Sequence, residues 1–168
     1  MKTMPRITAA RPGDLPMTLQ VTWADGMTGE VDLSGVIGRH RLLAPLMDPA
    51  WFAQVRVGEW GWSVEWGDDL DFGTDQLRRW AGEQSGDIMP TEDFQAWRRR
   101  CGLSLTAAAA LGLSRRMVAY YDNGAYPVPK TVMLACEGWE ARQAIGASRR
   151  PIHPRRSGGK EAAAGKAA

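Results

Sequence analysis

A few small and apolar residues at fixed spacing in the C-terminal half of the chain constrain its fold more than any other feature. Two helices that cross closely need a small residue where their backbones touch, and Ala108 supplies one. Four residues later, Gly112 permits the positive φ of a tight turn. Ser114 can then cap a second helix, on which Val118 and Tyr121 lie three residues apart and face inward. The spacing therefore predicts two short helices that meet at a turn.

The residues that follow would end the second helix. Asp122-Asn123-Gly124 combines an acidic residue with a glycine, which commonly terminates a helix. The whole stretch, SLTAAAALGLSRRMVAYYDN, resembles the helix-turn-helix of phage repressors of the Cro type. The resemblance implies a lambda-repressor-like, all-α DNA-binding bundle over residues 91–147. The link from Arg100 to the first of the two helices is slightly shorter than the family pattern.

Helical patterns flank this stretch on both sides. Thr91 can cap a helix whose apolar residues recur at spacings of three and four. Pro127 and Pro129 mark a break, after which Lys130 or Thr131 opens a further helix with one apolar face. The apolar residues are Phe94, Trp97 and Cys101 in the first of these helices, and Val132, Ala135, Cys136 and Trp139 in the last. Together with the central pair, they agree with the implied bundle.

The resemblance assigns base contacts to the helix over residues 115–122, whose N-terminal end would enter the major groove. Arg115 and Arg116 lie at that end, where arginine can pair with guanine O6 and N7 or clamp a phosphate. Tyr120 lies roughly one turn further along and outward, within reach of a base edge or phosphate. Ala119 can touch a thymine methyl group. Alternatively, the two arginines belong to an ordinary solvated helix face.

Two serines complete the set of candidate DNA-binding residues. The cap formed by Ser114 would leave the N-terminus of the second helix close to the DNA backbone. Ser104 is the polar residue available for a phosphate contact at the start of the first helix. The full set is Ser104, Ser114, Arg115, Arg116, Ala119 and Tyr120.

Residues 1–85 predict an α+β domain, a small mixed sheet with short helices. Residues 18–23 alternate polar and apolar side chains, as a half-buried strand does, and Asp25-Gly26 is a hairpin signal. Asp48 can cap a short helix with Pro49 in its first turn. Further strands are expected at residues 30–33, 54–57 and 62–66, and a helix from Thr74 or Asp75 to about Glu83.

As a whole, residues 5–84 resemble a bacterial family of small domains of unknown function. The matching pieces are Trp23-Ala24-Asp25-Gly26, Val31-Asp32-Leu33-Ser34, Pro45-Leu46-Met47-Asp48-Pro49 with Phe52, Val64-Glu65-Trp66 and Asp69-Leu70-Asp71. In some members this domain precedes a repressor-like helix-turn-helix, and members also occur beside toxin genes. The resemblance implies an α+β fold and no particular chemistry.

Two clusters in this domain have alternative interpretations. Trp60, Trp62, Val64 and Trp66 would share one face of a strand, which either packs against a helix or stacks unpaired bases. The packed sheet face is the expected one. The acidic run of Asp68, Asp69, Asp71 and Asp75 could bind a cation, but a turn followed by a helix cap is the expected role.

The two ends of the chain carry opposite charge. Residues 1–89 hold 8 Lys/Arg and 13 Asp/Glu, a net charge of −5. Residues 90–147 have a net charge of +2, and residues 148–168 one of +5. Residues 86–90 read as a polar linker and residues 148–168 as a disordered basic tail. We therefore expect only the C-terminal part to face a polyanion such as DNA.

Several classes of protein are excluded by what the sequence lacks. No stretch approaches the apolar length of a membrane span, and the N-terminus has no apolar signal core, so we expect a cytoplasmic protein. Cys101 and Cys136 cannot build a disulfide framework, and no pattern suggests a metal site or cofactor. His40 and His153 are the only histidines. Since no catalytic set is readable, we expect no enzyme.

The leading hypothesis is a sequence-specific DNA-binding transcriptional regulator that reads the major groove with residues 115–122 of each protomer. It should act as a homodimer on double-stranded DNA, because one short recognition helix reads too few base pairs. The N-terminal domain would supply dimerisation, a protein-partner surface or a ligand sensor. Two alternatives are an antitoxin-like protein that binds a partner and represses its own promoter, and a protein-interaction module that never meets DNA.

Overall fold

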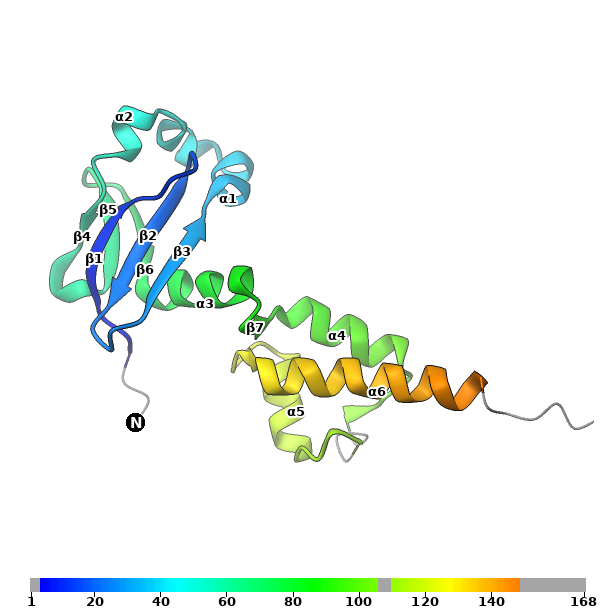
Figure 1. Cartoon of the computed structure of the whole chain (residues 1–168). Coiled ribbons are helices and arrows are strands. Elements are labelled where there is room, and N and C mark those ends of the chain that lie inside the picture. Colours follow the sequence, from blue (N-terminus) through cyan, green and yellow to red (C-terminus); the bar gives the residue numbers. More distant parts are fainter. Residues whose placement is uncertain (1–3, 106–109, 149–168) are drawn as a thin grey trace, which may run out of the picture.

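The computed structural model describes residues 4–105 and 110–148 of the chain. The described residues form two lobes that follow one another along the chain (Figure 1). Each lobe has its own hydrophobic core. The first lobe mixes strands and helices, and the second is mainly helical.

The first lobe is built on two small antiparallel sheets. The first sheet pairs β1 (Ile7–Pro12), β2 (Thr18–Trp23) and β3 (Thr28–Asp32) in that order. The second pairs β4 (Arg56–Val57), β5 (Ser63–Trp66) and β6 (Leu70–Gly73). The expected hairpin at Asp25-Gly26 joins β2 to β3, and the Asp25 carboxylate accepts a hydrogen bond from the amide of Met27. The expected mixed sheet is wrong, because all the strand pairs are antiparallel.

Helices surround these sheets. They are α1 (Ser34–Arg39), the 3-10 helix η1 (Arg41–Met47), α2 (Pro49–Phe52), the 3-10 helix η2 (Glu59–Gly61) and α3 (Thr74–Ser85). The predicted cap of α2 is confirmed, since Asp48 accepts from the amide of Ala50 at 2.9 Å. The core between α3 and the sheets includes Trp23, Val31, Val64, Trp66 and Leu77, each almost fully buried.

Three expectations for this lobe need correction. Residues 7–12 form strand β1, which was not expected. Only Ile7 in this strand is buried, so its sequence does not alternate between apolar and polar residues. The four-residue face of Trp60, Trp62, Val64 and Trp66 does not exist: Trp60 lies in η2 with a φ of +60° and is 70% exposed. Thr74 does not cap α3. Its hydroxyl instead accepts a hydrogen bond from Trp23 Nε1 and donates one to the carbonyl of Pro5.

The second lobe contains α4 (Thr91–Arg100), α5 (Arg115–Asp122) and the long α6 (Lys130–Ser148). Its core consists of Phe94, Trp97, Val118, Tyr121, Val128, Val132 and Cys136. The expected apolar faces of α4 and α6 are thus the buried faces. Trp97 Nε1 donates to the carbonyl of Cys136 at 3.1 Å and ties these two helices together. Both cysteines are free.

The segment 86–90 connects the two cores but is not an unstructured linker. Within it β7 (Ile88–Met89) pairs antiparallel with β8 (Val128–Pro129), so the second lobe is not purely helical. Lys130 Nζ lies 3.1 Å from the Asp87 carboxylate. Hydrogen bonds from Lys130 and Ser85 lower the pKa of Asp87 below its usual value. The segment is therefore held by strand pairing with β8 and by the ion pair with Lys130.

Thr91 also differs from its expected role as a helix cap. Pro90 occupies the cap position of α4, and the buried Thr91 hydroxyl accepts from Arg79 Nη2 at 2.7 Å. Arg79 belongs to α3 and also pairs with Glu83 at 2.8 Å. The hydrogen bond from Arg79 to Thr91 is therefore a second link between the lobes.

Within the part of the chain that the structure describes, no helix is long and apolar enough to cross a membrane. The same residues hold no group of three or more His, Cys, Asp or Glu side chains that could bind a metal ion.

The close approach of η2 to β1 generates a stability prediction. Gly61 has a φ of +74°, and a Cβ added there would lie 2.3 Å from the carbonyl oxygen of Ile7. We expect Gly61→Ala to lower the free energy of unfolding by roughly 3 kcal/mol. Alanine is strained at this positive φ, and the backbone of β1 must also shift to make room for the Cβ. Gly26→Ala is the matched control, because Gly26 has a φ of +82° but no atom within 4 Å of the added Cβ. It should cost only about 1 kcal/mol.

Urea unfolding of the two variants measures the difference. Equal losses for Gly61→Ala and Gly26→Ala would contradict the close contact between η2 and β1.

Candidate nucleic-acid interface

Helix α5 separates an inward and an outward face within eight residues. Ser114 caps the helix as predicted, with its hydroxyl accepting from the amide of Met117 at 3.2 Å. Val118 and Tyr121 are buried, whereas Arg115 and Arg116 are exposed. The division follows from the helical repeat, because positions three apart share a face.

The inward face is fixed against α4. The Phe94 and Tyr121 rings meet edge to face with centroids 5.9 Å apart, and burial raises the pKa of the Tyr121 hydroxyl. At the end of α5, Arg98 Nε donates to the Asp122 carboxylate at 2.8 Å. Gln95 Nε2 donates to the carbonyl of the same Asp122 at 2.6 Å. Helix α5 is therefore anchored by packing in its middle and by polar bonds at its C-terminus.

The outward face carries an arginine held by aromatic rings. The Arg116 guanidinium lies 5.3 Å from the centre of the Tyr120 ring, and its Nε donates to the Tyr120 hydroxyl at 2.7 Å. The Tyr120 ring in turn contacts that of Tyr126, with centroids 5.1 Å apart. Stacking of this kind restricts the guanidinium and leaves its outer N–H groups available to an acceptor.

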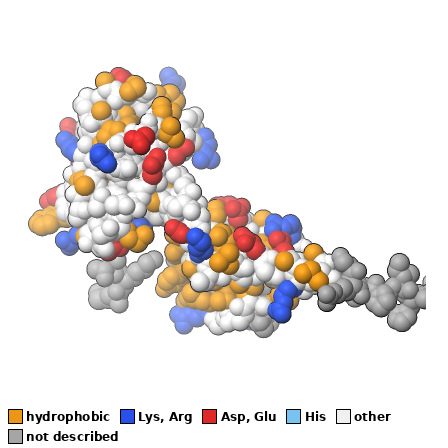
Figure 2. Space-filling view, in the orientation of Figure 1, with side chains coloured by type: hydrophobic (Ala, Val, Ile, Leu, Met, Phe, Trp, Pro, Cys, Tyr) orange, Lys and Arg blue, Asp and Glu red, His pale blue; other side chains and the backbone are white. Residues whose placement is uncertain are grey.

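Among the described residues, no acidic side chain neutralises the charge on this face. In residues 4–105 and 110–148, neither Arg115 nor Arg116 forms an ion pair, whereas Arg98 and Arg100 of α4 pair with Asp122 and Glu140. Figure 2 shows basic side chains at the lower edge of the second lobe, where α5 lies in Figure 1. The face is chemically suited to an anion or to a base edge with acceptor atoms.

The remaining residues predicted from the sequence do not all lie on this face. Ala119 is partly buried on α5. Ser104 is exposed and borders a cavity of about 10 Å³ together with Leu111 and Val118, on the inward side of α5. The structure therefore does not group Ser104 with the two arginines. Ala108 falls outside the described residues.

The turn before α5 has the predicted conformation at its glycine. Gly112 has a φ of +71°, and a Cβ added to it would meet no atom within 4 Å. Leu105 and residues 110–111 lie in 3-10 turns on either side of the undescribed stretch. What precedes α5 in the described residues is thus a short helical turn and a glycine bend.

Comparison with known proteins identifies the first lobe. Residues 7–83 match the family described as "Protein of unknown function (DUF2442)". The chain is also similar to the "Putative DNA Binding Protein NE0471" from Nitrosomonas europaea ATCC 19718, whose crystal structure is known. The two sequences are 45% identical. That match covers 83% of this chain and 88% of the other, with a TM-score of 0.54. The chain belongs to the DUF2442 family. A search of curated proteins found no match.

The DUF2442 match ends before α4, so the candidate interface on α5 lies outside it. Three residues that hold α5 or its outward side chains were not predicted from the sequence: Gln95, Arg98 and Tyr126. Gln95 and Arg98 lie on α4, more than twenty residues before the Asp122 that they bind, and no local spacing links them. Asp122 was the one residue whose type pointed to these contacts, because a partly buried carboxylate requires a hydrogen-bond partner.

The two faces of α5 should respond differently to substitution. Val118→Asp places an unpaired charge in the core, and we expect it to cost more than about 3 kcal/mol or to unfold the second lobe. Arg116→Ala removes an exposed side chain and should change stability by no more than about 0.5 kcal/mol.

Thermal unfolding monitored by circular dichroism distinguishes these outcomes. A Val118→Asp protein as stable as the unaltered chain, or an Arg116→Ala protein as unstable as Val118→Asp, would contradict the orientation of α5.

Proposed function

We propose that this DUF2442 chain is a sequence-specific DNA-binding transcriptional regulator and not an enzyme. Helix α5 acts as the recognition helix of a lambda-repressor-like helix-turn-helix and enters the major groove by its N-terminal end. Arg115 and Arg116 read guanine or clamp a phosphate, and Tyr120 positions Arg116.

The observation that carries the proposal is the outward face of α5. It places two arginines without ion-pair partners among the described residues at the capped start of a helix whose other face is locked into a core. A rigid helix holds such side chains more accurately than a loop, as base recognition requires. The DNA-binding designation of the NE0471 protein, 45% identical to this chain, supports the same class of function.

We further propose that the protein binds as a homodimer. A single helix of eight residues contacts too few base pairs for selective binding, and two copies on paired half-sites double the sequence that is read. The basic residues beyond Ser148 would add affinity for phosphates without selecting bases.

Selection of bound duplexes from a random DNA pool tests the proposal. A defined sequence should emerge, with two related half-sites. Arg116→Ala should then weaken binding to that sequence by about 1–3 kcal/mol, roughly 5- to 150-fold, with a much smaller effect on unselected DNA.

The control for this measurement is Arg39→Ala. Arg39 is an exposed arginine on α1 in the first lobe, so its removal subtracts the same charge at a distance from α5. Binding of the selected DNA that survives the double change Arg115→Ala and Arg116→Ala undiminished would refute recognition by α5. Failure to enrich any sequence would refute specific binding altogether.

A further inference from the structure

Strand β3 has one edge that no strand covers in residues 4–105 and 110–148. It is the last strand of the order β1-β2-β3, and its register with β2 fixes which backbone groups point away from the sheet. Leu33 donates to the carbonyl of Met17, and Trp23 donates to that of Met27, so the odd-numbered residues of β3 bond to β2. The N–H and C=O groups of Thr28, Glu30 and Asp32 therefore point to the free edge.

A side chain already occupies one end of this edge in the manner of a strand. The Gln84 amide accepts from the backbone N–H of Asp32 at 2.7 Å and donates to its carbonyl at 2.9 Å. These are the two bonds that a neighbouring strand would make to Asp32. In the described part of the chain, the corresponding groups of Thr28 and Glu30 have no such partner. Two residues of the edge thus remain open to pairing.

A hollow of about 510 Å³ runs beside these open residues, between β3 and the C-terminal half of α3. Its apolar lining includes Leu15, Trp23, Met27, Ala81 and Ile88. An added strand would direct every second side chain towards α3, into this hollow, because side chains alternate across a sheet. The remaining side chains would lie on the outer face, beside the side chains of Thr28 and Glu30.

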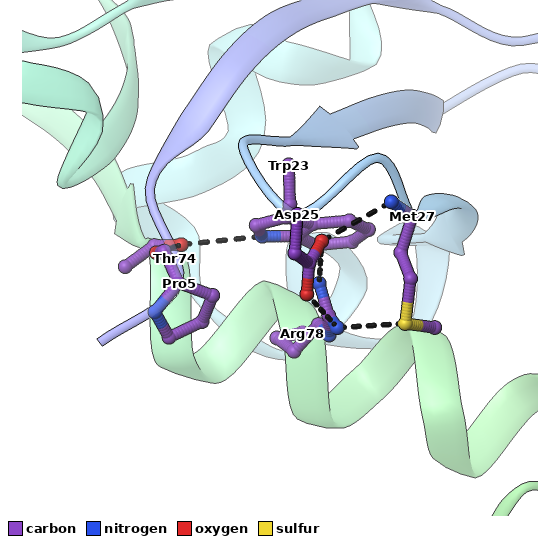
Figure 3. Close-up of polar contacts among 6 residues, drawn as sticks. All are labelled: Pro5, Trp23, Asp25, Met27, Thr74 and Arg78. Atoms are coloured by element: carbon purple, nitrogen blue, oxygen red, sulfur yellow. Dashed lines mark hydrogen bonds and ion pairs between the residues drawn. The ribbon is translucent and has the colours of Figure 1, made fainter. Parts of the chain in front are cut away.

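Three residues that line the hollow, Trp23, Met27 and Arg78, belong to a cluster of polar contacts around Asp25 (Figure 3). Arg78 pairs with both oxygens of the Asp25 carboxylate, at 3.2 and 2.7 Å, and lies over the Trp23 ring at 4.8 Å. The hydrogen bonds from Arg78 and from the amide of Met27 lower the pKa of Asp25 below its usual value. Because Asp25 occupies Arg78, this arginine does not offer a free cationic group to the hollow.

The charges around the hollow select the kind of strand that fits. Of the charged residues that line it, Arg78 is paired with Asp25 and Asp87 with Lys130, whereas Glu30 and Asp32 have no ion-pair partner among the described residues. Figure 2 shows acidic side chains gathered on the part of the first lobe where β3 lies. A second copy of β3 would place acidic residues opposite acidic residues, which is unfavourable. An extended segment with basic residues on its outer face would be attracted instead.

From this edge, its hollow and their charge, we propose that β3 is a docking strand for an extended peptide segment of a protein partner. The segment alternates apolar and basic residues and adds a fourth strand to the sheet beside Thr28 and Glu30. Backbone hydrogen bonds supply its affinity, and the apolar hollow and acidic rim supply its selectivity. This proposal does not depend on DNA binding by α5.

A synthetic peptide with the sequence Lys-Val-Lys-Val-Lys-Val-Lys, labelled with fluorescein, is the probe. It should bind the full chain, measured by fluorescence anisotropy. The first control peptide has glutamate in place of lysine and should bind at least about tenfold more weakly, because its charge matches that of the rim. The second control carries N-methyl groups on alternate residues, so it keeps all charges but lacks the N–H donors of one edge.

Two protein variants separate backbone pairing from charge. Glu30→Pro removes an outward N–H that does not bond to β2, and proline is tolerated on an edge strand for that reason. Glu30→Gln removes only the charge. We expect Glu30→Pro to weaken binding about tenfold or more and Glu30→Gln to weaken it by a smaller factor. Circular dichroism checks that both variants fold.

The N-methylated peptide decides the result even if Glu30→Pro does not fold. Loss of its binding to the unaltered chain supports strand addition. Binding equal to that of the parent peptide would show attraction by charge alone and would overturn the proposal. No binding of the lysine-valine peptide at millimolar concentration would overturn it as well.

Discussion

The packing of α3 on the β2–β3 hairpin is the interaction on which the rest of the molecule depends. It requires glycine at position 29, where an added Cβ would lie 2.9 Å from Ala81 and 3.1 Å from Trp23. This close approach buries Leu77 and Ala81 on one side of α3. The other side of the helix presents Arg79 to Thr91, and the chain continues directly into β7. The position of α3 therefore sets where the second lobe begins.

The second lobe obeys a similar division between a buried and an exposed face. In α5 the buried residues Val118 and Tyr121 fix the helix against α4, and Asp122 fixes its end through Arg98 and Gln95. The outward residues take no part in this core. The residues that stabilise the lobe and those that we propose to contact DNA are thus separated on one short helix, so the outward residues can change without loss of the fold.

The hollow beside β3, where we propose that a peptide binds, shares residues with the junction between the lobes. Asp87 and Ile88 line the hollow beside β3, while Asp87 pairs with Lys130 and Ile88 belongs to the strand that pairs with β8. An occupant of the hollow would touch the same short segment that leads from α3 into α4 and pairs with β8 and Lys130. This arrangement gives a physical route by which a partner on the first lobe could influence the second.

Elements with a local signal could be predicted from the amino-acid sequence alone. The β2–β3 hairpin follows from alternation and Asp25-Gly26, the α2 cap from Asp48, and the two faces of α5 from helical spacing after Ser114. The remaining strands and contacts depend on residues that lie far apart in the sequence, so they became visible only in the folded structure. Strand β1 has one buried residue, and β7 and β8 have two residues each, too few for a pattern. The bonds from Arg98 to Asp122 and from Gln84 to Asp32 join positions 24 and 52 residues apart, and only folding brings such groups together.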